Sequence, residues 1–98
     1  MIDDQEIAWL RKQIDAIDHQ LLALLSQRLD VVLRVGDKKR EKELPLYDPN
    51  REKALLERLS KDALEPVDEA MVRAVFAAIV TECRRIEGEH MASERGRD

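Results

Sequence analysis

Cysteine, aromatic residues and long apolar stretches are all scarce in this sequence of 98 residues. The one cysteine cannot form a disulfide within the chain, so we expect a cytoplasmic protein that folds without such cross-links. No apolar stretch approaches the length of a membrane span, and the opening residues do not resemble an export signal. The three aromatic residues and the 39% of charged residues argue against a β-sandwich or barrel.

Several classes of functional site are also disfavoured. The net charge of −4 argues against general nucleic-acid binding, which requires a clustered cationic face. His19, His90 and Cys83 do not have the spacing of metal ligands, so we expect no metal. Because a glycine-rich loop and a Ser-His-Asp or Cys-His arrangement are both missing, we expect neither a cofactor nor covalent catalysis.

What the sequence does contain is the pattern of a small all-α domain. Strong helix formers run from Asp4 to about Glu43, and apolar residues recur along this stretch with a heptad-like period. Asp48 and Pro49 predict the start of a second helix that ends near Leu64, and Asp68 predicts the start of a third. We expect one domain over residues 1–90, fraying near Gly88, and a disordered tail over 91–98.

The predicted first helix is too long for a compact monomer of this size. At 1.5 Å per residue it measures on the order of 60 Å, whereas a domain of about 100 residues has a radius of gyration of about 13 Å. Its apolar stripe extends over nearly its whole length, and two shorter helices cannot cover it. An intertwined helical homodimer is the simplest arrangement that covers this stripe.

Cationic residues interrupt that apolar stripe. Arg28 occupies a core position of the heptad, which is costly unless an anion meets it. Lys39 follows on nearly the same line of the helix, with Gly36 between them leaving room. The alternative is structural: Arg28 pairs with an acidic residue of another helix or extends to water, Gly36 is a tolerated helix glycine, and Lys39 is solvated.

More charged residues stand at the start of the second helix. Arg51 and Glu52 lie in its first turn, just after the segment that returns the chain past the first helix. An acidic residue is favoured there by the helix dipole, and Asp48 is explained as the N-cap. The dipole does not explain Arg51, which supports a cationic site that includes Arg28 and Lys39.

Three sequence segments together resemble a known family. The long helix with LRKQIDAIDHQLLALLSQRLDVVLRVGDKK, then YDPNRE, then a third helix ending VTECRRIE, resembles the all-helical chorismate mutases. The resemblance covers roughly residues 5 to 88. It implies an intertwined homodimer whose two active sites are built from both chains. It also implies conversion of chorismate to prephenate, an intramolecular rearrangement that needs no cofactor.

The resemblance further implies roles for individual residues. Arg28 and Arg51 would bind the substrate carboxylates together with Arg11 contributed by the partner chain. Lys39 would bind a carboxylate and the ether oxygen. Glu52, with Asp48 close by, would bind the ring hydroxyl. Two positions depart from the usual pattern: Cys83 stands where a small hydroxyl residue is frequent, and Glu87 stands where glutamine is frequent.

Glu87 would help catalysis only as the protonated acid, because an ionised carboxylate cannot donate a hydrogen bond to the ether oxygen. The alternative is that Glu87 lies solvated in a frayed last turn.

Two other functions stay open: isochorismate pyruvate lyase, which shares this fold, and a non-catalytic helical dimerisation module. Glu52 favours the mutase over the lyase. The sequence does not decide whether the chain is complete or part of a bifunctional enzyme.

Overall fold

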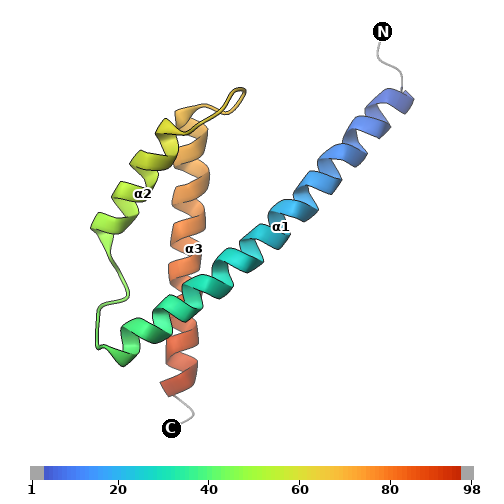
Figure 1. The fold of residues 1–98 in the computed structure, drawn as a ribbon. Helices are drawn as coiled ribbons and strands as arrows, with labels where there is room; N and C mark the ends of the chain where they lie inside the picture. Colours follow the sequence, from blue (N-terminus) through green and yellow to red (C-terminus); the bar gives the residue numbers. More distant parts are fainter. Residues whose placement is uncertain (1–3, 96–98) are drawn as a thin grey trace. The chain divides into compact units, whose positions relative to one another are not determined.

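The computed structural model describes residues 4–95, which form three helices and no strand. The helices are α1 (Asp4–Glu41), α2 (Pro49–Lys61) and α3 (Glu69–Arg95), as Figure 1 shows. The prediction of an all-α fold with a very long first helix is therefore confirmed. None of the described helices combines the length and the apolar character needed to cross a bilayer.

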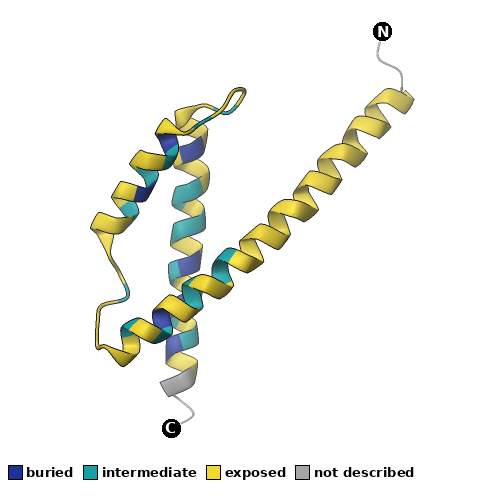
Figure 2. Ribbon diagram, viewed as in Figure 1, coloured by how far each residue is buried: buried dark blue, intermediate teal, exposed yellow. Residues whose placement is uncertain are grey.

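The chain divides into two units, Met1–Val31 and Val32–Asp98, and the division falls inside α1. What is described of the first unit is a single helix whose side chains are almost all exposed (Figure 2). The apolar stripe of this helix is 36% to 60% exposed at Ile7, Leu10, Ile14, Ile17, Leu21 and Leu24. Contiguous apolar surface of this kind is typical of a protein–protein contact.

In the second unit, α2 packs along α3 (Figure 1). Leu55 of α2 and Val72 of α3 are both buried. Ser60 is 2% exposed, and its hydroxyl accepts a hydrogen bond of 3.2 Å from Arg73 Nη2. The same hydroxyl donates to the Glu57 carbonyl at 2.9 Å, so this buried polar group is satisfied. These contacts hold α2 in register on α3.

The end of α1 is closed by a Schellman turn. The Leu44 N–H donates to the Lys39 carbonyl at 2.8 Å, and the Glu43 N–H donates to the Arg40 carbonyl at 3.1 Å. Glu43 occupies the left-handed position, with φ of 57°, although glycine is the usual residue there. The turn redirects the chain toward α2.

Aspartates begin the next two helices, as predicted from the sequence. Asp48 Oδ1 accepts from the Arg51 N–H at 3.0 Å, and Pro49 follows at the first helical position. Asp68 Oδ1 accepts from the Met71 N–H at 2.8 Å. Both predicted N-caps are therefore confirmed.

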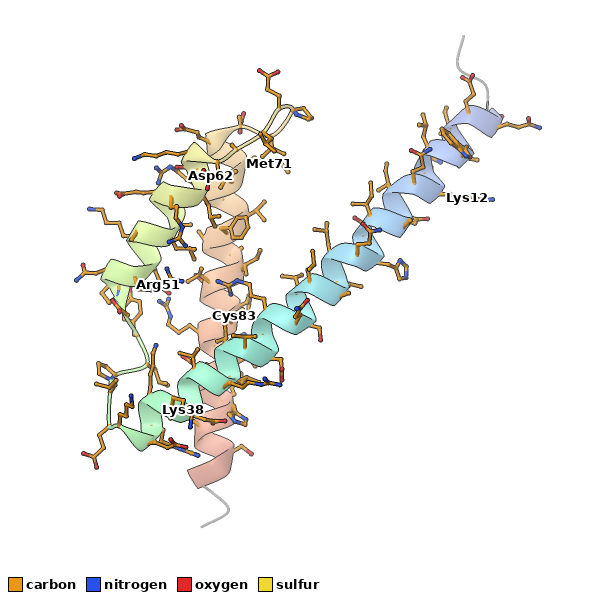
Figure 3. The ribbon with its side chains drawn as sticks, in the orientation of Figure 1. Lys12, Lys38, Arg51, Asp62, Met71 and Cys83 are labelled. Carbon is orange, nitrogen blue, oxygen red and sulfur yellow. The ribbon has the colours of Figure 1, made fainter. Side chains whose placement is uncertain are left out.

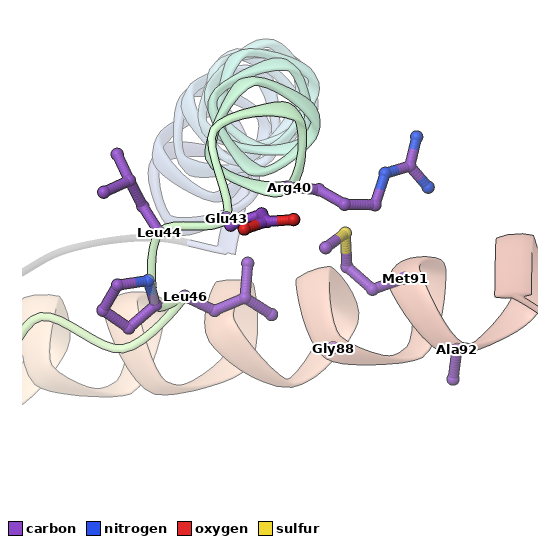
Figure 4. A pocket seen from close by; sticks show the side chains of 8 residues that line it. Arg40, Glu43, Leu44, Leu46, Gly88, Met91 and Ala92 are labelled. Carbon is purple, nitrogen blue, oxygen red and sulfur yellow. The ribbon is translucent and has the colours of Figure 1, made fainter.

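The predicted C-terminal tail is wrong over residues 91–95. α3 continues through Gly88 to Arg95, and Met91 is only 7% exposed. Met91 lines a cavity of about 500 Å³ together with residues of the turn after α1 (Figure 4). The remaining part of that prediction, residues 96–98, lies outside the described residues. The first two helices end at Glu41 and Lys61, two and three residues earlier than predicted.

Candidate functional site

Gly36 of α1 and the carboxyl side chain of Glu87 on α3 lie close together. A Cβ atom placed on Gly36 would lie 2.9 Å from Glu87 Oε2 and 3.0 Å from Glu87 Cγ. Glu87 itself is 4% exposed. A side chain at position 36 would therefore force the buried Glu87 side chain to shift.

Two opposing effects act on the pKa of Glu87. Burial raises its pKa because it disfavours the charged form, and the nearby ammonium group of Lys39 lowers it by a smaller amount. The net result is a pKa above the ordinary value of a glutamate. The expected alternative, a solvated Glu87 in a frayed last turn, is wrong.

Lys39 reaches from the last turns of α1 toward the segment that follows. Its Nζ donates to the carbonyl of Leu46 at 3.0 Å. An ammonium group carries three N–H donors, so this contact occupies one of them. Lys39 is thus held in a defined position by the backbone of the turn, beside Glu87.

A second contact joins the same helices close to Glu87. His90 Nε2 lies 3.4 Å from Asp37 Oδ1, and both side chains are partly exposed. Asp37 directly follows Gly36, and His90 is one turn beyond Glu87 on α3. The contact lies beside the buried Glu87, and Asp37 Oδ1 is a buried atom without a hydrogen bond among the described residues.

The first turn of α2 is joined to α3 one turn before Glu87. Arg84 Nη1 donates to both carboxylate oxygens of Glu52 at 2.8 Å. The Arg84 guanidinium also lies over the ring of Tyr47, 4.2 Å from its centre. Glu52, predicted as a ligand of the ring hydroxyl, is thus engaged with a guanidinium.

The other predicted residues of the second unit lie near these contacts. Asp48 acts as the N-cap and Arg51 lies exposed in the first turn of α2 (Figure 3). Cys83 is buried on α3, one turn before Glu87 and on the same side of the helix. We call the residues that carry these contacts the Lys39–Glu87 cluster: Gly36, Lys39, Glu52, Cys83, Arg84 and Glu87.

Arg11 and Arg28 lie on α1 within the first unit. They are 17 positions apart, which corresponds to about 25 Å along one helix. One small ligand therefore cannot contact both arginines of the same chain.

Sequence reasoning missed two members of this region, Arg84 and Tyr47. Arg84 stands three residues before Glu87, so it is a neighbour of that residue on the helix surface. This spacing could have identified Arg84 as a candidate site residue from the sequence. The partner of Arg84 was not predictable, because it depends on the register of α2 against α3.

The cluster has the chemistry of a hydrogen-bond donor site. A lysine and a carboxyl group whose pKa is raised can both donate to an oxygen that gains negative charge. Cys83 is a buried free cysteine. The cavity lined by Met91 contains none of the predicted site residues.

Comparison with known proteins agrees with this description. The family model "Chorismate mutase type II" matches residues 10–88. The chain belongs to this family. The matched residues include every member of the Lys39–Glu87 cluster.

Three similar proteins illustrate the range of this family. The 4-amino-4-deoxychorismate mutase of Streptomyces pristinaespiralis is 35% identical over 85 residues, covering 86% of this chain and 66% of that protein. The bifunctional chorismate mutase/prephenate dehydratase of Aquifex aeolicus is 35% identical over 88 residues, but the chain spans only 24% of it. The structure of chorismate mutase from Helicobacter pylori in complex with prephenate has a TM-score of 0.84 and 28% identity, covering 91% of this chain and 97% of that one.

The contact between Gly36 and Glu87 predicts that alanine substitution changes the free energy of unfolding differently at Gly36 and at Gly88. Gly88→Ala should stabilise the protein by about 0.5–1 kcal/mol, because alanine favours a helix and no atom lies within 4 Å of the new methyl group. Gly36→Ala should lose this gain, because its methyl group must displace the buried Glu87. Urea unfolding at equal protein concentrations measures both. Equal stabilisation by the two substitutions would contradict the proposed close packing.

Proposed function

We propose that this protein converts chorismate to prephenate. The observation that carries the proposal is the buried Glu87, which lies against Gly36 beside Lys39 and has a raised pKa. Membership of the chorismate mutase family and the similarity to a structure in complex with prephenate support it. The chain spans less than two thirds of several relatives, so any further activity of a longer protein is a separate question.

The reaction needs positioning and charge stabilisation. A C–O bond of chorismate breaks while a C–C bond forms within the same molecule, and negative charge grows on the ether oxygen. Lys39 and the protonated Glu87 would donate hydrogen bonds to this oxygen. Arginine forks suit the two carboxylates of the substrate and would hold it in the compact reactive conformation.

We assign the carboxylates to Arg28, Arg51 and the partner subunit's Arg11, with Cys83 packing against the substrate. Asp48 and Glu52 would lie at the ring hydroxyl. A homodimer accounts for the arginine from the second chain, and it also covers the exposed apolar stripe of the first unit. The cytoplasmic location expected from the sequence belongs to the same proposal.

A second candidate substrate is 4-amino-4-deoxychorismate, because a relative with 35% identity is named as the mutase of that compound. It differs from chorismate only in an amino group that replaces the ring hydroxyl. The residues that face this substituent therefore decide between the two substrates.

The test of the proposal is turnover of chorismate by the purified protein, followed as prephenate that acid converts to phenylpyruvate. Lys39→Ala should lower kcat/KM at least about 100-fold, since removing one donor to a developing oxyanion typically costs that much. The matched control is Lys38→Ala, which removes an exposed ion pair with Glu41 and should stay within about twofold. Formation of pyruvate in place of prephenate would identify the lyase instead, and no product at all would favour the dimerisation module. Near wild-type activity of Lys39→Ala would contradict the assignment of this site.

The raised pKa of Glu87 leads to a prediction of how turnover depends on pH. The protonated acid is the active form, so kcat should fall as pH rises through the pKa of Glu87, which burial places above its ordinary value. Glu87→Gln should remove this fall, because the amide still donates and does not titrate. Glu89→Gln changes an exposed residue of the same helix and should keep the wild-type profile. The same fall in Glu87→Gln would exclude Glu87 as its origin.

A shared active site predicts complementation between two inactive variants. Arg11→Ala and Arg28→Ala homodimers should each be inactive, because each lacks one arginine in both sites. Refolding a mixture should produce heterodimers in which one of the two sites has both arginines, with up to about half the activity of a wild-type dimer. Heterodimers that are confirmed by mass spectrometry but remain inactive would argue against sharing.

A further inference from the structure

The Arg84–Glu52 ion pair changes the charge that the first turn of α2 offers to a ligand. Both carboxylate oxygens of Glu52 accept from the same guanidinium nitrogen at 2.8 Å. The Glu52 side chain is 22% exposed and the Arg84 side chain is 36% exposed. The pair is therefore partly shielded from water, and the adjacent Arg84 guanidinium compensates the negative charge of the Glu52 carboxylate.

Two further contacts fix this arrangement. Tyr47 lies under the Arg84 guanidinium at 4.2 Å, which restricts its movement. Asp48, the other acidic residue at the start of α2, already accepts from the Arg51 N–H. Both acidic side chains of this turn are thus engaged, one by a guanidinium and one by the helix backbone.

We propose that Arg84 determines substrate choice at this site, so that the enzyme selects the ring hydroxyl of chorismate over the amino group of 4-amino-4-deoxychorismate. This inference rests on the proposed function, which places the ring substituent at Glu52. The amino group is carried by a saturated ring carbon and is protonated near neutral pH. An ammonium group requires a carboxylate whose charge is not already compensated, and a nearby guanidinium repels it.

A hydroxyl group meets no such conflict. It can donate to a Glu52 oxygen and accept from Arg84, whose Nη2 and Nε are not used by Glu52. Arg84 acts on the substrate largely through Glu52, so it is a specificity-determining residue. Its position one turn before Glu87 brings this selection close to the reacting groups.

The experiment compares kcat/KM for chorismate and 4-amino-4-deoxychorismate. The wild type should prefer chorismate by at least about tenfold. Arg84→Gln should shift this ratio at least about tenfold toward the amino compound, because Glu52 then has an uncompensated charge. Glu52→Gln in the Arg84→Gln background should reverse that shift, since it removes the carboxylate that attracts the ammonium group. Arg85→Gln is the matched control: Arg85 is exposed, pairs with Glu82 and Glu89, and should leave the ratio unchanged.

The outcomes separate this inference from the proposed function. A folded, helical wild type that rearranges neither compound would overturn the proposed function and the inference with it. A wild type that rearranges chorismate but uses the amino compound equally well would overturn the inference alone. An Arg84→Gln variant that loses both activities in equal proportion would show a purely structural role and would also overturn it. If Arg84→Gln does not fold, Arg84→Lys keeps the charge and must retain the wild-type preference.

Discussion

Glu87 is buried directly against Gly36 of α1, where any side chain would force its carboxyl group to shift. A buried carboxyl group favours its protonated form, and this converts an acid into a hydrogen-bond donor. Lys39 opposes the effect, but the balance still raises the pKa of Glu87. The donor chemistry of the site thus depends on one close approach between two helices, and the Asp37–His90 contact lies beside it.

The turn after α1 and the first turn of α2 position the remaining groups around that contact. The Schellman turn brings the Leu46 carbonyl within reach of Lys39, so the lysine is held by backbone rather than by a flexible partner. The Asp48 cap begins α2 at the point where Glu52 meets Arg84 on α3. Local backbone chemistry at two helix ends therefore sets the distances among charged groups from three helices.

The sequence predicted those features that depend on local chemistry. Caps at Asp48 and Asp68 identified helix starts correctly, and helical periodicity placed Gly36 and Lys39 on one face. The tail was mispredicted because Met91 is buried and shares a cavity with the turn after α1, a tertiary arrangement that no periodic pattern reveals. Arg84 was missed for a related reason, because its pairing with Glu52 depends on how α2 lies along α3. The roles of Arg11 and Arg28 came from family resemblance and remain proposals.

The central claim, that burial keeps Glu87 protonated beyond the range of an ordinary glutamate, is tested most directly by carbon-13 NMR of the glutamate carboxyl groups. Glu87→Gln identifies its resonance. We predict that Glu87 titrates at a higher pH than an ordinary glutamate, and that Lys39→Gln raises its pKa further by removing the nearby positive charge. Titration of Glu87 in the range of an ordinary glutamate would contradict the account.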